Sequence, residues 1–128
     1  MSFNDKKIYQ LGVEATLEVI GGKWKPIILC HLGQGPLRSG ELKRRIPQVT
    51  QKMLTQQLRE LEHDGIISRR VYPQVPPKVV YAITDEGKSL RELLIAMSNW
   101  GEQRIKRAQA NGQPIELSHQ EDDGFLAL

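Results

Sequence analysis

The sequence is poor in cysteine: it has one, Cys30, among 128 residues, so no disulfide can form within the chain. Such usage is typical of proteins in a reducing compartment, and we expect a cytoplasmic location. Long apolar runs are missing as well, and the first residues lack the apolar stretch of a signal peptide. These absences argue against a secreted protein and against a membrane partner.

Residue groups that usually mark an enzyme are also missing. The three histidines, His31, His63 and His119, are far apart and have no Cys or acid at ligand spacing, so we expect no metal site. Cys30 and His31 are neighbours in a helical stretch and cannot face each other as nucleophile and base. The string Gly21-Gly22-Lys23 lacks the earlier glycine and the following Ser or Thr of a phosphate-binding loop. The sequence therefore predicts a protein that is not an enzyme and uses no cofactor.

Charge is what the sequence does have, and it is unevenly distributed. The formal net charge is +3, but residues 111–128 contain four acids and no Lys or Arg, which leaves +7 on residues 1–110. Within that part, residues 38–78 hold nine basic and four acidic residues. Such clustering is typical of a protein with a polyanionic partner such as nucleic acid. A solvated basic face is the alternative that charge alone leaves open.

The predicted elements run from helices to a hairpin and back to a helix. Apolar spacing, glycines and prolines predict helices at 11–20, 23–32, 39–46 and 50–64, strands at 66–72 and 78–84, and a last helix from 84 to about 110. The segment 73–77, which has three prolines, is the predicted hairpin tip. The length fits one domain, 1–110, followed by an acidic, loosely ordered tail, 111–128.

The predicted helix at 50–64 has two distinct sides. Leu54, Leu58 and Leu61 recur at helical spacing and predict a buried side. At about 100° per residue, the other side carries basic, hydroxyl and amide side chains, those of Lys52, Thr55, Gln56 and Arg59. A helix that packs on a core through its leucines would therefore present a polar and cationic outer face.

The helices at 39–46 and 50–64 are separated by the short turn 47–49. This is the arrangement of a helix-turn-helix, whose second helix enters the major groove of DNA. The hairpin that follows would lie beside that groove as a wing. We therefore predict a mainly α fold with a small β-hairpin wing, that is, a winged helix-turn-helix.

The side chains on these elements suit a DNA duplex. The amides of Gln51 and Gln56 can pair bidentately with adenine edges, and Thr55 can touch a thymine methyl group. Basic side chains suit guanine edges or phosphates. Arg69 and Arg70 cannot both face DNA, because neighbours in a strand point to opposite sides. The predicted DNA-binding set is Arg38, Thr50, Gln51, Lys52, Thr55, Gln56, Arg59, Arg70 and Lys78.

Plainer interpretations stand beside these assignments. The two amides and Thr55 can be ordinary solvent-facing residues. Arg59 can pair within its own helix with Glu62 or His63. The basic run 43–45 is typical of a solvated face. A winged-helix module that binds another protein, without binding DNA, is the alternative of a different functional class.

Three strings carry a family resemblance: EATLEVIGGKWK at 14–25, PQVTQKMLTQQLRELEHDG at 47–65 and YPQVPP at 72–77. Together they resemble the HxlR family of bacterial winged-helix regulators, relatives of the MarR type, over residues 11–101. The resemblance implies a transcriptional regulator that binds an inverted-repeat operator in double-stranded DNA. It also implies a homodimer formed through the first and last helices, and either repression or activation as the outcome.

The apolar residues agree with the implied homodimer. The apolar stripe of the last helix is long for a small domain to bury alone, and the helix at 11–20 is apolar on more than one side. Core packing accounts for part of the stripe. The predicted dimer interface comprises Leu11, Leu17, Leu90, Leu94, Met97 and Trp100.

Several HxlR-like regulators sense oxidants through a cysteine that precedes the acid corresponding to Glu14. This sequence has Leu11-Gly12-Val13-Glu14 at that place, so the redox role does not carry over there. Cys30 lies in an apolar helix, where a single cysteine is more often inert and buried. A thiol-based sensor that uses Cys30, with its thiolate stabilised by Lys23 or Lys25, stays as an alternative. No residue pattern identifies an effector ligand.

Overall fold

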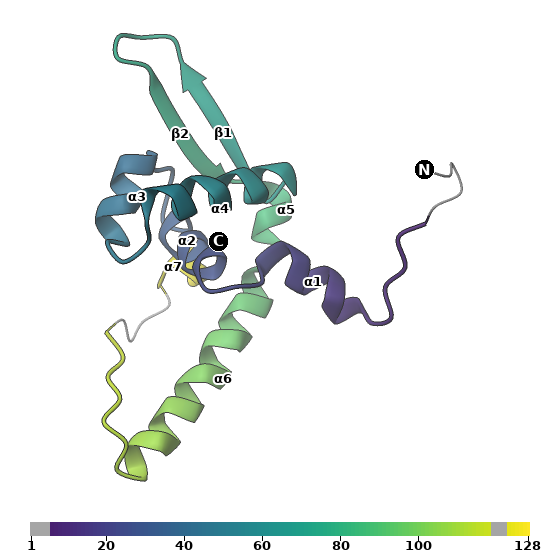
Figure 1. The fold of residues 1–128 in the computed structure, drawn as a ribbon, viewed down its shortest axis with the longest axis vertical. Helices are drawn as coiled ribbons and strands as arrows, with labels where there is room; N and C mark the ends of the chain where they lie inside the picture. The colour runs from purple at the N-terminus through teal and green to yellow at the C-terminus, as the bar shows by residue number, and fades with distance from the viewer. Residues whose placement is uncertain (1–5, 119–122) are drawn as a thin grey trace.

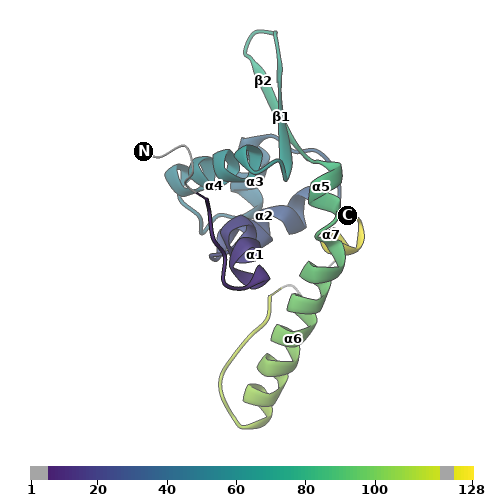
Figure 2. The same ribbon diagram turned by 90° about the vertical axis from the view of Figure 1, so that its right-hand side faces the viewer.

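The computed structural model describes residues 6–118 and 123–128. Its elements are α1 (Gly12–Ile20), α2 (Trp24–Leu32), α3 (Ser39–Arg45), α4 (Gln51–His63), β1 (Ile67–Tyr72), β2 (Lys78–Ile83), α5 (Asp85–Lys88), α6 (Arg91–Ala110) and α7 (Asp123–Leu126). In both views the hairpin projects from one side of a helical body and α6 projects from the other (Figures 1 and 2). None of the helices in the described part of the chain is long and apolar enough to cross a membrane. The predicted fold, mainly α with a two-stranded wing, is confirmed.

The core lies between α2, α3 and α4. Leu54, Leu58 and Leu61 of α4 are buried, as their spacing predicts. They belong to one apolar cluster with Ile28 and Leu32 of α2. Burying an aliphatic side chain of this size stabilises a fold by about 1.5–3 kcal/mol. The leucine side of α4 therefore fixes the helix on the body and leaves its other side to solvent.

The ends of α4 follow local signals in the sequence. The Thr50 hydroxyl accepts a hydrogen bond from the Met53 backbone N–H at 3.1 Å, which satisfies one of the free amides of the first turn. Gly65 follows the helix with a φ of +75°, a left-handed conformation that favours glycine. Both ends lie within one residue of the predicted range 50–64.

The wing is attached to the body at two places. β1 and β2 pair antiparallel, in a register that sets Ile67 opposite Ile83, and β1 follows α4 directly in the chain. In addition, Leu37 and Tyr81 exchange backbone hydrogen bonds of 3.0 and 2.8 Å. The base of the wing is thus tied to the segment that precedes α3 as well as to α4.

The last predicted helix, 84 to about 110, is two helices in the structure. The Thr84 hydroxyl accepts from the Gly87 N–H at 3.1 Å and caps α5. A turn then interrupts the helix, because the Leu90 N–H bonds to the Gly87 carbonyl, three residues back, at 3.1 Å. A Cβ on Gly87 would collide with the Ile66 carbonyl oxygen, so α5 lies in backbone contact with the start of the wing. The prediction of one continuous helix is wrong at this point.

The end of the acidic tail packs onto the body. Phe125 of α7 is buried in the apolar cluster, and α7 contacts α2 and α6. A Cβ on Gly124 would collide with the Cys30 carbonyl oxygen, so the two backbones touch there. The expectation of a loosely ordered tail is therefore wrong for residues 123–128, because Phe125 is buried in the core and Leu128 packs against it. Residues 119–122, also part of that expectation, lie outside the described residues.

Candidate DNA-binding surface

The outer side of α4 is polar and open. Lys52, Gln56 and Arg59 are exposed, on the side away from the buried leucines. Gln51 is exposed in the first turn, and Thr55 is half-buried on one flank. The structure thus brings five of the residues predicted to bind DNA to the solvent side of one helix.

Several of these polar side chains have partners on the helix itself. Gln51 Nε2 donates to Thr55 Oγ1 at 3.2 Å, and Gln56 Nε2 donates to Glu60 Oε1 at 3.4 Å. Each bond leaves the amide oxygen and the second amide hydrogen of the glutamine for another partner. The Thr50 hydroxyl accepts from the helix backbone and keeps its own hydrogen to donate. The helix can therefore meet a base or a phosphate without losing its cap.

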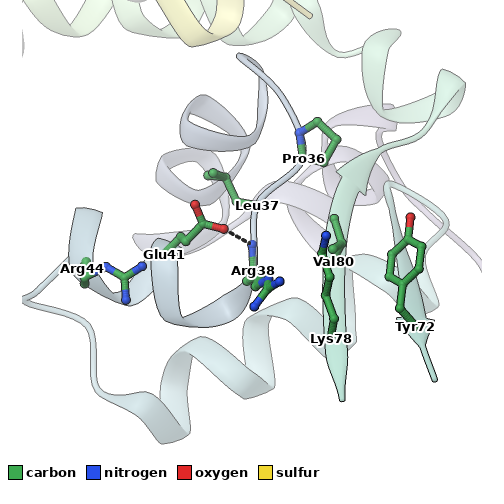
Figure 3. A pocket seen from close by; sticks show the side chains of 8 residues that line it. All are labelled: Pro36, Leu37, Arg38, Glu41, Arg44, Tyr72, Lys78 and Val80. Atoms are coloured by element: carbon green, nitrogen blue, oxygen red, sulfur yellow. Dashed lines mark hydrogen bonds between the residues drawn. The ribbon is translucent and has the colours of Figure 1, made fainter. Parts of the chain in front are cut away.

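A basic hollow lies between α3 and the wing (Figure 3). It is lined by Pro36, Leu37, Arg38, Glu41, Arg44, Tyr72, Lys78 and Val80. Its three cations come from the segment before α3, from α3 itself and from β2. Glu41 is its one acid, and that carboxylate accepts from the Arg38 backbone N–H at 3.1 Å. Three cations and one occupied carboxylate on an open surface suit a DNA phosphate.

The wing turns one of its faces to the basic hollow. The Lys78 ammonium lies 5.2 Å from the centroid of the Tyr72 ring, and both side chains line the hollow. Side chains alternate along a strand, so Arg70, opposite Val80, shares this face and Arg69 lies on the other. Of the two neighbouring arginines, the one predicted to bind DNA is on the side of the basic hollow.

Only Arg38 and Lys78 of the residues that line the basic hollow belong to the set predicted from sequence; Arg44 and Tyr72 are among those that the prediction missed. Arg44 belongs to a basic run that is typical of a solvated face, yet it lies three residues after Glu41 and so points to the same side of α3. That spacing is the only sequence signal for it. Tyr72 lies opposite Lys78 in the hairpin. The proline-rich sequence of the hairpin tip does not determine the strand register, so the pairing of Tyr72 with Lys78 could not be predicted from it.

A buried lysine lies behind the outer side of α4. Lys25, in the first turn of α2, is only 6% exposed, and its Nζ is 2.8 Å from Glu60 Oε2. This hydrogen bond lowers the pKa of the Glu60 carboxyl below its usual value. A second hollow at this junction is lined by Glu18, Lys25, Arg59, Glu60, His63 and Asp64. Arg59 therefore borders the junction of α1, α2 and α4 as well as the outer side of α4.

The apolar residues of the predicted dimer interface fall into two groups. Four of them remain exposed on α1 and α6: Leu11, Leu17, Met97 and Trp100. Leu94 is 1% exposed and packs in the core of its own chain, because the first turns of α6 face the body. Its assignment to the interface is therefore wrong. Leu90 is half-buried against the same core.

Cys30 lies on α2 and is half-buried. Its carbonyl oxygen contacts the backbone of Gly124 in α7. Within residues 6–118 and 123–128, no three His, Cys, Asp or Glu side chains are grouped so that they could hold a metal ion. The functional groups that the structure does gather are the basic and amide side chains of α3, α4 and the wing.

These features define a class of protein. The body formed by α2, α3 and α4 presents the polar side of its last helix, and a hairpin follows that helix and flanks it (Figure 1). This is the architecture of a winged helix-turn-helix, in which the second helix of the α3–α4 pair enters the major groove.

Comparison with known proteins then gives the family. The model of the HxlR-like helix-turn-helix matches residues 19–109. The HTH-type transcriptional regulator YtcD of Bacillus subtilis is 60% identical over 103 residues, which are 80% of this chain and 82% of YtcD. The regulatory protein MalR of Fusobacterium mortiferum is 54% identical over 99 residues, which are 77% of this chain and 93% of MalR. The chain belongs to the HxlR-like helix-turn-helix family.

Solved structures agree with this assignment. A crystal structure of the HTH-type regulator ytcD matches with a TM-score of 0.72 at 59% identity, over 76% of this chain and 99% of that one. The redox regulator HypR in its reduced form matches with a TM-score of 0.72 at 50% identity, over 77% of this chain and 97% of that one. The family, the relatives and the fold together make this protein a DNA-binding transcriptional regulator.

Proposed function

We propose that the protein regulates transcription by binding an inverted-repeat operator as a homodimer, with α4 of each copy in a major groove. The observation that carries the proposal is the division of α4. Its leucines are buried in the core, and its amide and basic side chains are exposed on the opposite side. A helix anchored in this way holds its polar side chains at fixed positions relative to the rest of the protein.

The exposed side of α4 supplies the base-reading groups in this proposal. Gln51 and Gln56 each keep an amide oxygen and an amide hydrogen, which is the pair that matches the N6 and N7 atoms of adenine. Thr55 lies between them and can meet a thymine methyl group or a phosphate. Lys52 and Arg59 reach guanine edges or the backbone, and Thr50 donates to a phosphate at the helix start.

The basic hollow supplies the backbone contact. Arg38, Arg44 and Lys78 surround one open space, so a single strand of DNA running between α3 and the wing would meet all three. Arg70, on the same face of the wing, extends this basic track. Contacts of this kind add affinity for any sequence and position the recognition helix without reading bases.

The homodimer is proposed because α1 and α6 expose apolar surface that the described residues, 6–118 and 123–128, leave uncovered. Trp100 has 65% of its surface exposed, and Leu11 and Leu17 are exposed on α1. A second copy is the occupant that fits, because a two-fold dimer presents two recognition helices about one DNA turn apart. An operator with inverted-repeat symmetry follows from that arrangement.

The proposal is tested by selecting duplexes from random-sequence DNA with the full chain and measuring Kd for the selected duplex and for random DNA over a range of salt. We expect the selected sequence to be an inverted repeat, bound in a ratio of two chains per duplex. Log affinity should fall linearly with log salt concentration, because Lys and Arg displace condensed counterions.

The opposite result would favour another class of function. If no duplex is enriched and binding is insensitive to salt, DNA is not the partner, and a winged-helix module that binds protein becomes the better interpretation. If DNA is bound but each duplex takes one chain and shows no symmetry, the homodimer part of the proposal fails and the rest stands.

A further inference from the structure

Glu60 occupies an unusual place between the core and the proposed base-reading residues. Its two carboxylate oxygens have different partners. Oε2 is 2.8 Å from the Nζ of Lys25, which is almost fully buried, and Oε1 accepts from Gln56 Nε2 at 3.4 Å. Gln57 Nε2 also donates to Oε2, at 3.4 Å. A chain of polar contacts therefore runs from α2, through Glu60, to the exposed amide of Gln56.

The chemistry of the carboxylate fixes which way this amide faces. An ionised carboxylate accepts hydrogen bonds and cannot donate them, so only the nitrogen of Gln56 can face Glu60. The reversed amide would place two oxygens against each other. The contact between Gln51 and Thr55 has no such direction, because a hydroxyl group both donates and accepts.

Lys25 makes this arrangement rigid. A half-exposed carboxylate on a DNA-facing helix would otherwise be free to rotate, and its charge would repel phosphates. The Lys25 ammonium holds one oxygen and compensates the charge. The other oxygen is then left in a fixed position toward Gln56. With the nitrogen of Gln56 held on one side, its oxygen and its second hydrogen are presented together, which is the pair that adenine requires.

We propose that Glu60, anchored by Lys25, is a positioning residue that fixes the orientation of the Gln56 amide and so sets the base preference at one position of the operator. This inference rests on the proposed function, because it presumes that Gln56 reads a base. It assigns a role in specificity to two residues that do not themselves touch the DNA.

The experiment measures base discrimination at each operator position. The operator is the duplex that the protein selects from random DNA, and discrimination is the ratio of Kd for a singly substituted operator to Kd for the selected one. Gln56→Ala identifies the base pair that Gln56 reads. We expect Glu60→Ala to lower discrimination at that base pair by about two- to tenfold, the cost of ordering one free side chain. At the position read by Gln51, discrimination should stay unchanged.

The control is Glu62→Ala, which removes the same charge from an exposed position of the same helix. It should shift affinity for all duplexes alike and leave discrimination as in the wild type. The double variant Gln56→Ala/Glu60→Ala should discriminate no worse than Gln56→Ala alone, because the two residues act through one contact.

A second variant separates positioning from folding, because Glu60→Ala leaves the buried Lys25 ammonium without its partner. Lys25→Met/Glu60→Ala removes both charges. We expect this double variant to lose discrimination as Glu60→Ala does, but to melt at a higher temperature than Glu60→Ala. Recovery of wild-type discrimination in this variant would overturn the inference. The inference would also be overturned if Glu60→Ala kept wild-type discrimination, or if it lost discrimination equally at every operator position. A Gln56→Ala variant that changes discrimination at no operator position would overturn it as well. If the wild type itself selects no operator, the proposed function fails and this inference fails with it.

Discussion

The two longest helices of this molecule, α4 and α6, differ in how much of their apolar surface is buried within their own chain. α4 has 13 residues, and its three leucines are buried in the core of its own chain. α6 has 20 residues, of which only Leu94 is fully buried, and Met97 and Trp100 stay exposed. The apolar side of α4 is therefore buried within one chain, and the side that is left for a partner is polar. By contrast, α6 has apolar surface that a second protein surface would have to cover.

The largest effect should come from breaking the apolar surface of α6. Trp100→Asp places a charge in the middle of the proposed interface, so we expect a monomer by sedimentation equilibrium. Operator affinity should fall by about 10²–10⁴-fold, because two half-sites would no longer be bound together. Val75→Asp adds the same charge at a fully exposed apolar residue of the wing tip, so it is the control for the oligomeric state and should stay dimeric. A Trp100→Asp protein that stays dimeric would contradict this use of α6.

The next effect concerns the polar side of α4. Gln56→Ala should cost about 1–3 kcal/mol of binding free energy at the selected operator and leave binding to random DNA nearly unchanged, because a bidentate base contact is lost. Arg70→Ala should weaken both duplexes alike. Titrations of both variants with both duplexes at one salt concentration measure the difference. Equal losses on the two duplexes for Gln56→Ala would show that it does not read a base.

A smaller effect tests the basic hollow. Arg44→Ala should weaken binding to all sequences and reduce the slope of log affinity against log salt by about one, since one phosphate contact disappears. Arg45→Ala removes the same charge from an exposed neighbour that does not line the hollow. If the two variants show the same slope of log affinity against log salt, Arg44 makes no phosphate contact of its own and belongs to a solvated face, as its sequence context suggests.

The smallest effect concerns the link between α2 and α4. The Glu60 carboxyl has a pKa lowered from 4.5 by its hydrogen bond to Lys25, so it stabilises the folded state above that pH. As the pH falls below 4.5 and through the lowered folded-state pKa, this contribution is lost. We expect the melting temperature of the wild type to fall more steeply from pH 5 to pH 3 than that of Lys25→Met/Glu60→Ala. Parallel curves would show that the ionisation of Glu60 contributes no stability that is lost on acidification.

Local signals in the sequence account for α4 and the wing. Thr50 and Gly65 mark the ends of α4, and the leucine spacing gives its buried side, because helix caps and periodicity depend on residues close together in the chain. The strands follow from their β-branched residues. The outer residues of α4 were predictable for the same reason, since they lie opposite the leucines.

Contacts between distant residues account for what the sequence did not reveal. Lys25 and Glu60 are far apart in the chain and meet only because α2 packs on α4. The docking of α7 depends on backbone contact between Gly124 and Cys30, which no local pattern encodes. Leu94 looked like its exposed neighbours in the apolar stripe, and only the packing of α6 on the body separates it from them.

The backbone bonds between Leu37 and Tyr81 have a consequence for how a duplex is gripped. They form an isolated β-bridge that ties the strand that carries Lys78 to the segment that carries Arg38. We expect this second attachment to limit bending of the wing at its base. We therefore expect a mismatch between the groove spacing of a duplex and the distance from α4 to the wing to be taken up mainly by the DNA. Pliable base steps that the protein never touches should then be favoured in its operators.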